Sequence, residues 1–419
     1  MHLNKYGHVA GALSLALVAC GSGSGDLAEE WRAREVLDAR AYVVSEQSDQ
    51  LFVADMRSLT EVGVVDTRTG DGANSNHMAI ISSDARKIYV VATAKDAVVV
   101  VDAQTLRVLS TIATGAHPTH ANLCPGCSPT GGDELWLVNE GHAHDGDAPQ
   151  DGAGHPGSIS VIDMQTDRVT QTLLDASLMV PHFVRFSAGS AYVPSIGGNQ
   201  ITVIDVATRR VSDVLLLDGV SAPGACAADP CGFADAQIDQ NGLLVSAHIE
   251  SGQVLVYDTV SRERKRDIRG GSRPWAVFVD LEDNGFDTHL MPNWADSSVS
   301  LIDVELQVEV ARSREGDAES YGVNYSRLAP GEAFVLNRQK ERVAIIDRQT
   351  GAAIDSLAMG GTTETASTSA DGRYLLLPLS STNQFAIWDI VQREEVALFE
   401  GVGVYPWSVT TTGGQNYCH

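Results

Sequence analysis

The sequence contains few basic residues and few aromatic side chains. Its 419 residues include 29 Lys and Arg against 54 Asp and Glu, which gives a formal net charge of −25, and aromatic residues make up 6%. A surface this acidic repels phosphate backbones, so we expect no nucleic acid partner. The sequence also lacks a phosphate-binding glycine loop, a nucleophile-elbow serine and an HExxH zinc motif. These absences exclude several large enzyme classes.

Long hydrophobic runs are missing as well, apart from one run near the start. The run Val9–Ala19 is too short for a stable membrane-spanning helix. It ends in Leu-Val-Ala-Cys20, which resembles the lipobox of bacterial lipoproteins, and a flexible Gly/Ser tract follows. The resemblance implies a signal peptide over 1–19, a lipidated Cys20 with a tether over 20–35, and a folded part over 36–419. An ordinary signal peptide is the alternative. We therefore expect a protein of the bacterial cell envelope, periplasmic or on the outer membrane, which contacts the membrane through its lipid only.

Cysteine is scarce, but four of the cysteines form two pairs that are close together in the sequence. Apart from Cys20, two local pairs stand out, Cys124 with Cys127 and Cys226 with Cys231. In an exported protein such pairs predict disulfides that close surface loops. A zinc site built from the four cysteines is the alternative. Cys418 has no obvious partner.

Glycine, in contrast, is abundant at 39 residues, and the chain contains an internal repeat. Each repeat is a β-rich segment that ends in an apolar strand followed by Asp. The eight aspartates are Asp55, Asp102, Asp163, Asp205, Asp258, Asp303, Asp347 and Asp389. Most are 42–47 residues apart, which is the length of a four-stranded propeller blade. The pattern predicts an all-β, closed β-propeller of eight blades, with seven blades as the alternative. Each Asp is expected to cap a turn.

The two ends of the chain predict how the ring closes. The first repeat lacks an innermost strand, because Ala41–Val44, Leu51–Ala54 and Val62–Val65 match the second, third and fourth strands of a blade. The segment Tyr405–Val409 resembles an innermost strand with no strand after it. We expect these N- and C-terminal strands to form one blade together, since closure hides edge strands from solvent.

Two family resemblances support this fold. Lys87–Val91, Ser158–Asp163 and Ser190–Pro194 resemble the YVTN family of β-propellers, which contains binding proteins and enzymes. Gly115–Asn122 and Glu134–Val138 are similar to one blade of the eight-bladed haem domain of cytochrome-type nitrite reductases. That resemblance implies a place for His117 on the distal side of a haem at the channel mouth. No Cys-x-x-Cys-His motif for haem attachment is present, so nitrite reduction is not implied.

Histidines gather on one predicted face of the ring. Eight of the ten beyond the signal peptide fall before innermost strands or after second strands, and these connections share one face. Imidazole suits Cu²⁺ and Zn²⁺, and it also ligates haem. The candidate ligands of a metal or a haem-type tetrapyrrole are His117, His120, His142, His144, His182 and His248. Hydrophilic loop or packing roles are the alternative.

Two further groups of residues are candidates for binding. Arg273, Trp275, Tyr321 and Trp407 precede or begin innermost strands, where aromatic side chains suit a flat or sugar-like ligand at the mouth. On the opposite face, Asp280, Glu282 and Asn284 have the alternating oxygen ligands of a calcium loop. The distal acid of an EF-hand is missing there, so an acidic turn is the alternative.

The sequence therefore favours a binding protein of the cell envelope over an enzyme. Its histidine-bearing face is expected to hold a metal, a metal-porphyrin or an envelope protein partner. An enzyme at the same mouth, either a haem-dependent oxidoreductase or a metal-dependent lactonase, is the second hypothesis. A pure protein-interaction scaffold is the third.

Overall fold

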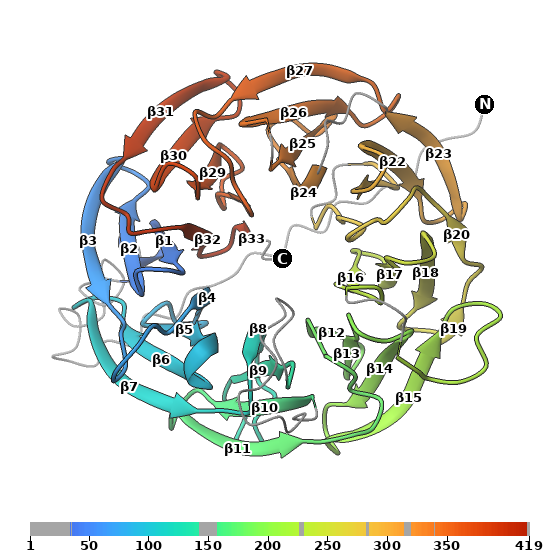
Figure 1. Ribbon diagram of the computed structural model, residues 1–419, viewed down its shortest axis with the longest axis horizontal. Coiled ribbons are helices and arrows are strands. Elements are labelled where there is room, and N and C mark those ends of the chain that lie inside the picture. The colour runs from blue at the N-terminus through green and yellow to red at the C-terminus, as the bar shows by residue number, and fades with distance from the viewer. Residues whose placement is uncertain are drawn as a thin grey trace, which may run out of the picture.

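The protein folds as a closed ring of eight β-sheets (Figure 1). The computed structural model describes residues 34, 36–141, 157–225, 230–281, 285–313, 320–338 and 340–416. Each sheet is antiparallel and consecutive sheets follow one another around the ring. The prediction of an eight-bladed propeller is confirmed. None of the described helices has the length and hydrophobicity that a membrane crossing needs.

The first four blades contain the following strands. Blade 1 has β1 (Arg40–Ser45), β2 (Gln50–Asp55), β3 (Thr60–Asp66) and β32 (Pro406–Thr411). Blade 2 has β4 (Asn76–Ile81), β5 (Lys87–Ala92), β6 (Ala97–Asp102) and β7 (Arg107–Ala113), with the 3-10 helix η1 (Thr93–Lys95) between β5 and β6. Blade 3 has β8 (Pro118–Cys124), β9 (Glu134–Asn139), β10 (Ser158–Asp163) and β11 (Arg168–Leu173). Blade 4 has β12 (Arg185–Ser187), β13 (Ser190–Pro194), β14 (Gln200–Asp205) and β15 (Arg210–Leu216).

The other four blades complete the ring. Blade 5 has β16 (Gln237–Ile238), β17 (Leu243–Ala247), β18 (Gln253–Asp258), β19 (Glu263–Arg264) and β20 (Ile268–Arg269). Blade 6 has β21 (Thr288–Asn293), β22 (Ser298–Asp303) and β23 (Val308–Ser313). Blade 7 has β24 (Ser320–Tyr325), β25 (Glu332–Asn337), β26 (Arg342–Asp347) and β27 (Ala353–Ala358). Blade 8 has β28 (Ser367–Thr368), β29 (Tyr374–Leu379), β30 (Gln384–Asp389), β31 (Glu394–Phe399) and β33 (Gln415–Asn416).

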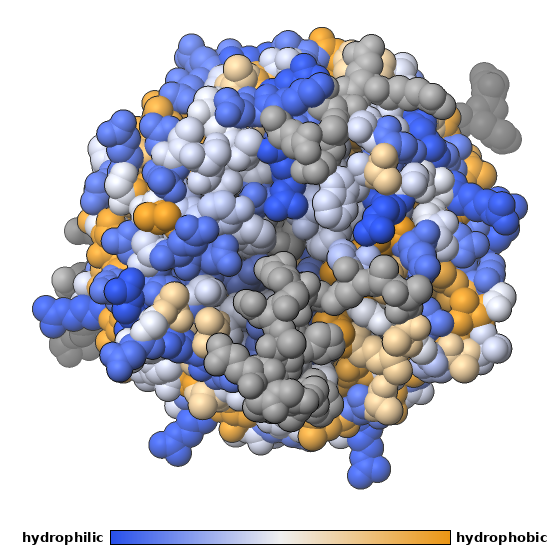
Figure 2. All heavy atoms as spheres, in the orientation of Figure 1, coloured by the Kyte–Doolittle hydropathy of each residue, from blue (hydrophilic) through white to orange (hydrophobic). Residues whose placement is uncertain are grey.

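The core lies between the faces of adjacent blades. The second and third strands are buried along almost their whole length, as in β5 and β6, whereas the outermost strand β7 is largely exposed. Val, Ile and Leu from neighbouring blades interdigitate between the sheets, which suits β-branched side chains. Figure 2 shows hydrophilic residues spread over the viewed face and apolar residues mainly along the rim of the ring.

The repeated aspartates cap turns, as the sequence predicts. In all eight, a carboxylate oxygen accepts a hydrogen bond from a main-chain N–H two or three residues further on. At Asp347, both the N–H and the hydroxyl of Thr350 donate, at 2.7 and 2.6 Å. The Thr350 hydroxyl and N–H lower the pKa of Asp347, because they stabilise its charged form.

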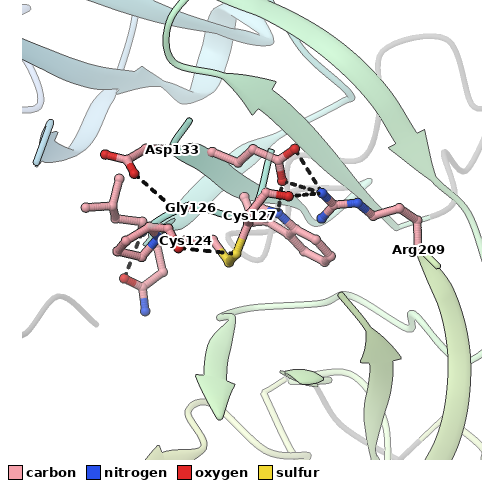
Figure 3. The surroundings of a disulfide bond; sticks show 10 residues. Cys124, Gly126, Cys127, Asp133 and Arg209 are labelled. Carbon is pink, nitrogen blue, oxygen red and sulfur yellow. Dashed lines mark hydrogen bonds and ion pairs between the residues drawn. A yellow bond between two sulfur atoms is a disulfide. The ribbon is translucent and has the colours of Figure 1, made fainter. Parts of the chain in front are cut away.

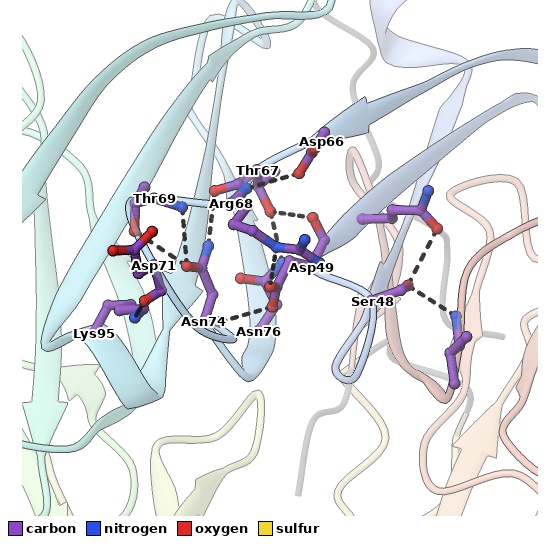
Figure 4. Close-up of polar contacts among 12 residues, drawn as sticks. Ser48, Asp49, Asp66, Thr67, Arg68, Thr69, Asp71, Asn74, Asn76 and Lys95 are labelled. Atoms are coloured by element: carbon purple, nitrogen blue, oxygen red, sulfur yellow. Dashed lines mark hydrogen bonds and ion pairs between the residues drawn. The ribbon is translucent and has the colours of Figure 1, made fainter.

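Blade 1 closes the ring, and its seam is reinforced by polar contacts. Strand β32 pairs antiparallel with β1, so the predicted closure by N- and C-terminal strands is confirmed. Close to this seam, Gly403 has a φ of +107° and lies against Ser45 and Ser48, where a Cβ would clash. The main-chain N–H of Val404 donates to the Ser48 hydroxyl at 2.8 Å (Figure 4).

The loop that leads from blade 1 to blade 2 is fixed by a buried carboxylate. Asp49 accepts hydrogen bonds from the Arg68 guanidinium at 3.1 Å and from the main-chain N–H of Asn74 at 2.9 Å (Figure 4). The Asn74 side chain in turn donates to the carbonyl of Thr67 at 2.7 Å. This loop connects the end of β3 to the start of β4, and these hydrogen bonds fix its conformation.

Two details of the fold differ from the expected pattern. The chain does not end its pairing at β32, because β33 follows and pairs with β28 of blade 8. In blade 6, isolated bridges at Pro274 and Phe278 replace a regular innermost strand. The Tyr325 hydroxyl inserts there, since it accepts from Leu290 N–H at 2.9 Å and donates to the Phe278 carbonyl at 2.6 Å. A side chain from blade 7 thus takes over a ladder hydrogen bond of blade 6.

Candidate functional site

Unusual turns lead the chain into the innermost strands on the histidine-bearing face. His117, Val180, Arg273 and Tyr405 each precede a proline and have φ values of +49° to +57°. A left-handed conformation is costly for such residues, so it persists only where the surroundings fix it. The N–H of His117 donates to the Asp96 carboxylate at 2.8 Å. These turns hold the mouth residues in place.

Three histidines from consecutive blades meet at this mouth. Nε2 of His77, on β4, lies 3.1 Å from Nε2 of His120, on β8. The His120 ring also lies 4.4 Å from that of His182, which precedes β12. His120 and His182 are buried. In β4 and β8 a β-bulge interrupts the pairing at these positions, and bulges commonly redirect side chains next to functional sites.

A buried carboxylate completes this cluster. Glu140 follows β9 and its side chain has no exposed surface. Its carboxylate oxygens lie 3.8 Å from Nε2 of His117 and 3.9 Å from Nε2 of His182. The Thr119 hydroxyl donates to it at 2.9 Å. Potential ligand atoms of His120, Glu140 and His182 all lie within 4.8 Å of one another, which makes these residues a candidate metal site.

A hydrogen bond to the main chain determines which nitrogen of His182 is protonated and which carries a lone pair. Nδ1 of His182 lies 2.9 Å from the carbonyl oxygen of Ala234. A carbonyl only accepts hydrogen bonds, so Nδ1 carries the proton and donates. In the neutral ring the lone pair is then on Nε2, the nitrogen next to Glu140. Such orientation by an outer hydrogen bond is typical of metal-binding histidines.

Aromatic and charged side chains extend this cluster into a closed circuit, which we call the mouth ring. Each member contacts the next through a ring contact, an ion pair or a hydrogen bond. In order the members are Trp407, His77, His120, His182, Trp275, Tyr321, Arg338, Glu364 and Tyr405.

In the mouth ring, aromatic side chains separate the three histidines from the Arg338–Glu364 ion pair. Trp407 lies 5.4 Å from His77 and Trp275 lies 5.9 Å from His182, so a tryptophan flanks the histidines on each side. Trp275 is close to Tyr321, at 5.0 Å, and the Arg338 guanidinium covers the Tyr321 ring. All predicted mouth residues except Arg273 are members. Arg273 lies next to the ring, over Trp294.

The structure places the other predicted residues elsewhere or does not describe them. His142, His144, Glu282 and Asn284 lie outside the described residues. His248 is not part of the metal-ligating group found among the described residues, and its Nδ1 lies 3.0 Å from the Ser251 hydroxyl. Burial lowers the pKa of His248.

The predicted calcium ligand Asp280 has a strong partner of another kind. Its carboxylate forms a 2.6 Å ion pair with Arg348, and both side chains are buried. The guanidinium also lies over the rings of Phe286 and Tyr325. Asp280 therefore belongs to a contact between blades 6 and 7.

The disulfide between Cys124 and Cys127 is present, as predicted (Figure 3). Cys231 is disulfide-bonded too, and its predicted partner Cys226 lies outside the described residues. Cys20 also lies outside them, so its lipidation stays a prediction.

Sequence reasoning missed Glu140, the acidic member of the site. The residue directly follows the second strand of a blade, and the selected residues His142, His144 and His248 also follow second strands in the sequence. Its position after a buried strand was the available signal. His77 and Arg338 were missed for a similar reason, because their importance depends on neighbours from other blades.

Of the comparisons with known proteins, the one with solved structures supports the fold. No protein-family model matches the sequence, and no curated protein matches it. Among solved structures, the chain is similar to dihydro-haem d1 dehydrogenase NirN in complex with DHE, with a TM-score of 0.65 and 16% identity over 90% of this chain and 76% of that one. It is also similar to the computationally designed protein Ika8 (TM-score 0.60, 14% identity, 83% and 93% covered) and to Kuenenia stuttgartiensis hydrazine synthase (TM-score 0.50, 16% identity, 80% and 97% covered). At these identities the likeness shows a shared propeller fold.

Proposed function

We propose that the protein binds a divalent transition metal ion through His120, Glu140 and His182. The observation that carries this proposal is a buried carboxylate beside imidazoles. The lone-pair nitrogen of His182 lies 3.9 Å from a carboxylate oxygen, and a cation between two such electron-rich atoms would offset the cost of burying them. Either a metal ion or a proton can serve, so the two alternatives define the test.

The donor set fits Zn²⁺ and similar ions. Two imidazoles and one carboxylate are the three protein ligands of several catalytic zinc sites. The same set of ligands also binds Fe²⁺. Bond lengths of about 2.0–2.1 Å place tetrahedral ligand atoms about 3.4 Å apart. The 3.9 Å distance between His182 and Glu140 therefore requires a contraction of about 0.5 Å. Three protein ligands leave a coordination position for a further ligand.

A tetrapyrrole that contains a metal is the second candidate for this face. It is favoured by the tryptophans that flank the histidines, since flat aromatic walls suit a flat conjugated ligand. The structural neighbour NirN is named for dihydro-haem d1, which supports the same idea. In that case His120 and His182 are the residues that would reach the bound metal.

Titration of metal-stripped protein tests both candidates. We expect Zn²⁺ to bind with a stoichiometry of one in calorimetry and to lose at least a hundredfold in affinity in His120→Ala. His248→Ala is the matched control, because His248 is buried on the same face but outside the ligand group. A Soret band that develops with haemin and disappears in His120→Ala favours the tetrapyrrole. Binding of neither probe would refute the proposal.

The predicted location and activity follow as separate proposals. We propose that Cys20 is lipidated and anchors the ring to the cell envelope, which mass spectrometry of the N-terminal peptide from membrane fractions tests. Zn²⁺-dependent lactone hydrolysis and haem-dependent oxidation are the activities to assay once binding is established. A binding protein without turnover is our first expectation.

A further inference from the structure

The Cys124–Cys127 disulfide lies at the far end of β8 from His120. It spans the turn between β8 and β9, in the sequence Cys-Pro-Gly-Cys. The two strands are already paired in register at this end, where Cys124 faces Glu134. The main-chain N–H of Cys127 also donates to the carbonyl of Cys124 at 3.4 Å, so the turn holds the two cysteines close together without the disulfide. A loop this short also gains the least from cross-linking, since the stabilisation grows with loop length.

Other contacts fix the turn without the sulfur atoms. The Arg209 guanidinium, from blade 4, donates to the carbonyl of Cys127 at 2.9 Å (Figure 3). The N–H of Gly126 donates to the Asp133 carboxylate at 3.0 Å. Arg209 also forms an ion pair with Glu134 at 2.7 Å, which fixes the guanidinium beside the carbonyl of Cys127. The turn is expected to keep its shape when the disulfide opens.

The two sulfur atoms differ in their surroundings. Cys124 is 3% exposed and packs in an apolar cluster with Trp136 and Val138, whereas Cys127 is partly exposed. Pro125 and Gly126, between them, are exposed, and a Cβ added at Gly126 would meet nothing within 4 Å. An incoming thiolate can thus approach Cys127 from solvent, whereas Cys124 is shielded.

We infer that Cys124–Cys127 is a redox-active disulfide that exchanges with an external dithiol through Cys127. One thiolate of the dithiol attacks Sγ of Cys127, the bond between the two cysteines breaks, and Cys124 leaves as a thiolate that takes up a proton. The second thiol of the dithiol then attacks the mixed disulfide and releases Cys127. The external dithiol is oxidised to a disulfide by two electrons, and its two protons end on Cys124 and Cys127.

The disulfide of Cys231 offers an internal control. Cys231 is 2% exposed and disulfide-bonded, so its own sulfur is shielded from direct attack by a thiolate in the folded ring. The full chain is incubated with dithiothreitol at pH 7, quenched with acid, and alkylated with isotopically distinct reagents before and after full reduction. Mass spectrometry then gives the reduction rate of each cysteine, while circular dichroism follows the fold.

We expect Cys124 and Cys127 to be reduced at least tenfold faster than Cys231, with an unchanged circular dichroism spectrum. Glutathione disulfide should then form an adduct on Cys127 in the Cys124→Ser variant. In Cys127→Ser, the shielded Cys124 should form at least tenfold less adduct. Reduction that occurs only together with unfolding would overturn the inference, as would equal adduct formation in two variants that are both folded. Metal binding at the mouth does not enter either readout.

Discussion

Two buried clusters on opposite faces of the ring each contain a carboxylate and histidine. They differ in the cation that neutralises the negative charge of the carboxylate. On one face, the Asp280 carboxylate pairs with Arg348 at 2.6 Å, next to buried His289. On the other, the Glu140 carboxylate lies 3.8 and 3.9 Å from the imidazoles of His117 and His182. A guanidinium is charged at every physiological pH, whereas an imidazole is charged only when it is protonated.

This difference distinguishes the structural cluster at Asp280 from the metal site proposed at Glu140. Asp280 has a permanent cation, and the cluster stabilises the contact between blades 6 and 7. The ion pairs of Glu140 with His117 and His182 depend on a proton, which a metal ion can replace. Burial of a carboxylate therefore does not by itself indicate a binding site, and the charge of its partner has to be considered as well.

Removal of the permanent cation should have the largest effect. In Arg348→Met, Asp280 stays buried without its partner, and we expect a loss of about 3–5 kcal/mol in the free energy of unfolding, measured with urea. Arg312→Gln is the matched control, because Arg312 also makes a 2.6 Å pair, with Glu309, but both side chains are partly exposed. Its loss should stay below about 1 kcal/mol. Equal losses in the two variants would contradict the structural role of Arg348.

The second prediction concerns Glu140 with and without metal. In metal-free protein, Glu140→Gln should change the free energy of unfolding by less than about 1 kcal/mol, because the ion pairs of Glu140 with His117 and His182 form only when these imidazoles are protonated. Zn²⁺ at a hundred times its dissociation constant should stabilise the wild type by about 2.7 kcal/mol and leave the variant unchanged. Thermal unfolding at both conditions measures the difference. A variant that Zn²⁺ stabilises as strongly as the wild type would show that Glu140 is not a ligand.

The third prediction uses pH to examine the Asp280 cluster. Burial, together with Arg348, lowers the pKa of His289 to about 3. The folded protein thus keeps His289 neutral, while the unfolded chain takes up a proton below pH 6.5. Stability from this residue is complete above pH 6.5 and falls by up to about 1.4 kcal/mol per pH unit as the pH decreases toward 3. Urea unfolding at pH 7 and pH 5 should show a smaller loss in His289→Gln. An identical loss in both proteins would contradict the buried, neutral state.

The smallest effect is expected at the repeated turns, which contribute neither to the buried ion pair at Asp280 nor to the proposed metal site at Glu140. Asp347 is partly exposed and accepts its hydrogen bonds from Thr350. Asp347→Asn keeps the shape but removes the charge, so we expect a loss of about 0.5–1.5 kcal/mol and no change in Zn²⁺ binding. Urea unfolding and calorimetry measure the two quantities. A change in Zn²⁺ affinity would mean that the turns are coupled to the mouth.

The fold was predictable because its signals are local and repeated. Each Asp that ends a strand caps its own turn, so spacing alone predicts the blades. The closure between β1 and β32 followed from a first repeat that lacks one strand. The insertion of Tyr325 into the ladder of blade 6 was not predictable, because it depends on how two blades pack.

The site was predictable only in part, because it also depends on how residues from different blades pack together. His120 and His182 were selected because they occupy one kind of connection, and the structure brings them together. Glu140 lies on the same face but in the other kind of connection, directly after the second strand β9, and a glutamate there has no special spacing. Asp280 shows the opposite error, since its apparent calcium motif is local whereas its partner Arg348 lies 68 residues away. Distant partners, and therefore charge balance, cannot be read from a single sequence.

Anomalous scattering from crystals grown with Zn²⁺ shows whether the ion binds between His120, Glu140 and His182. Data collected above and below the zinc absorption edge locate the ion without any assumption about its ligands. We expect one strong peak about 2.0–2.2 Å from the ligand atoms of His120, Glu140 and His182. A fully occupied peak elsewhere, or no peak while His182 directly hydrogen-bonds to Glu140, would contradict this expectation and leave a protonated ion pair at the mouth.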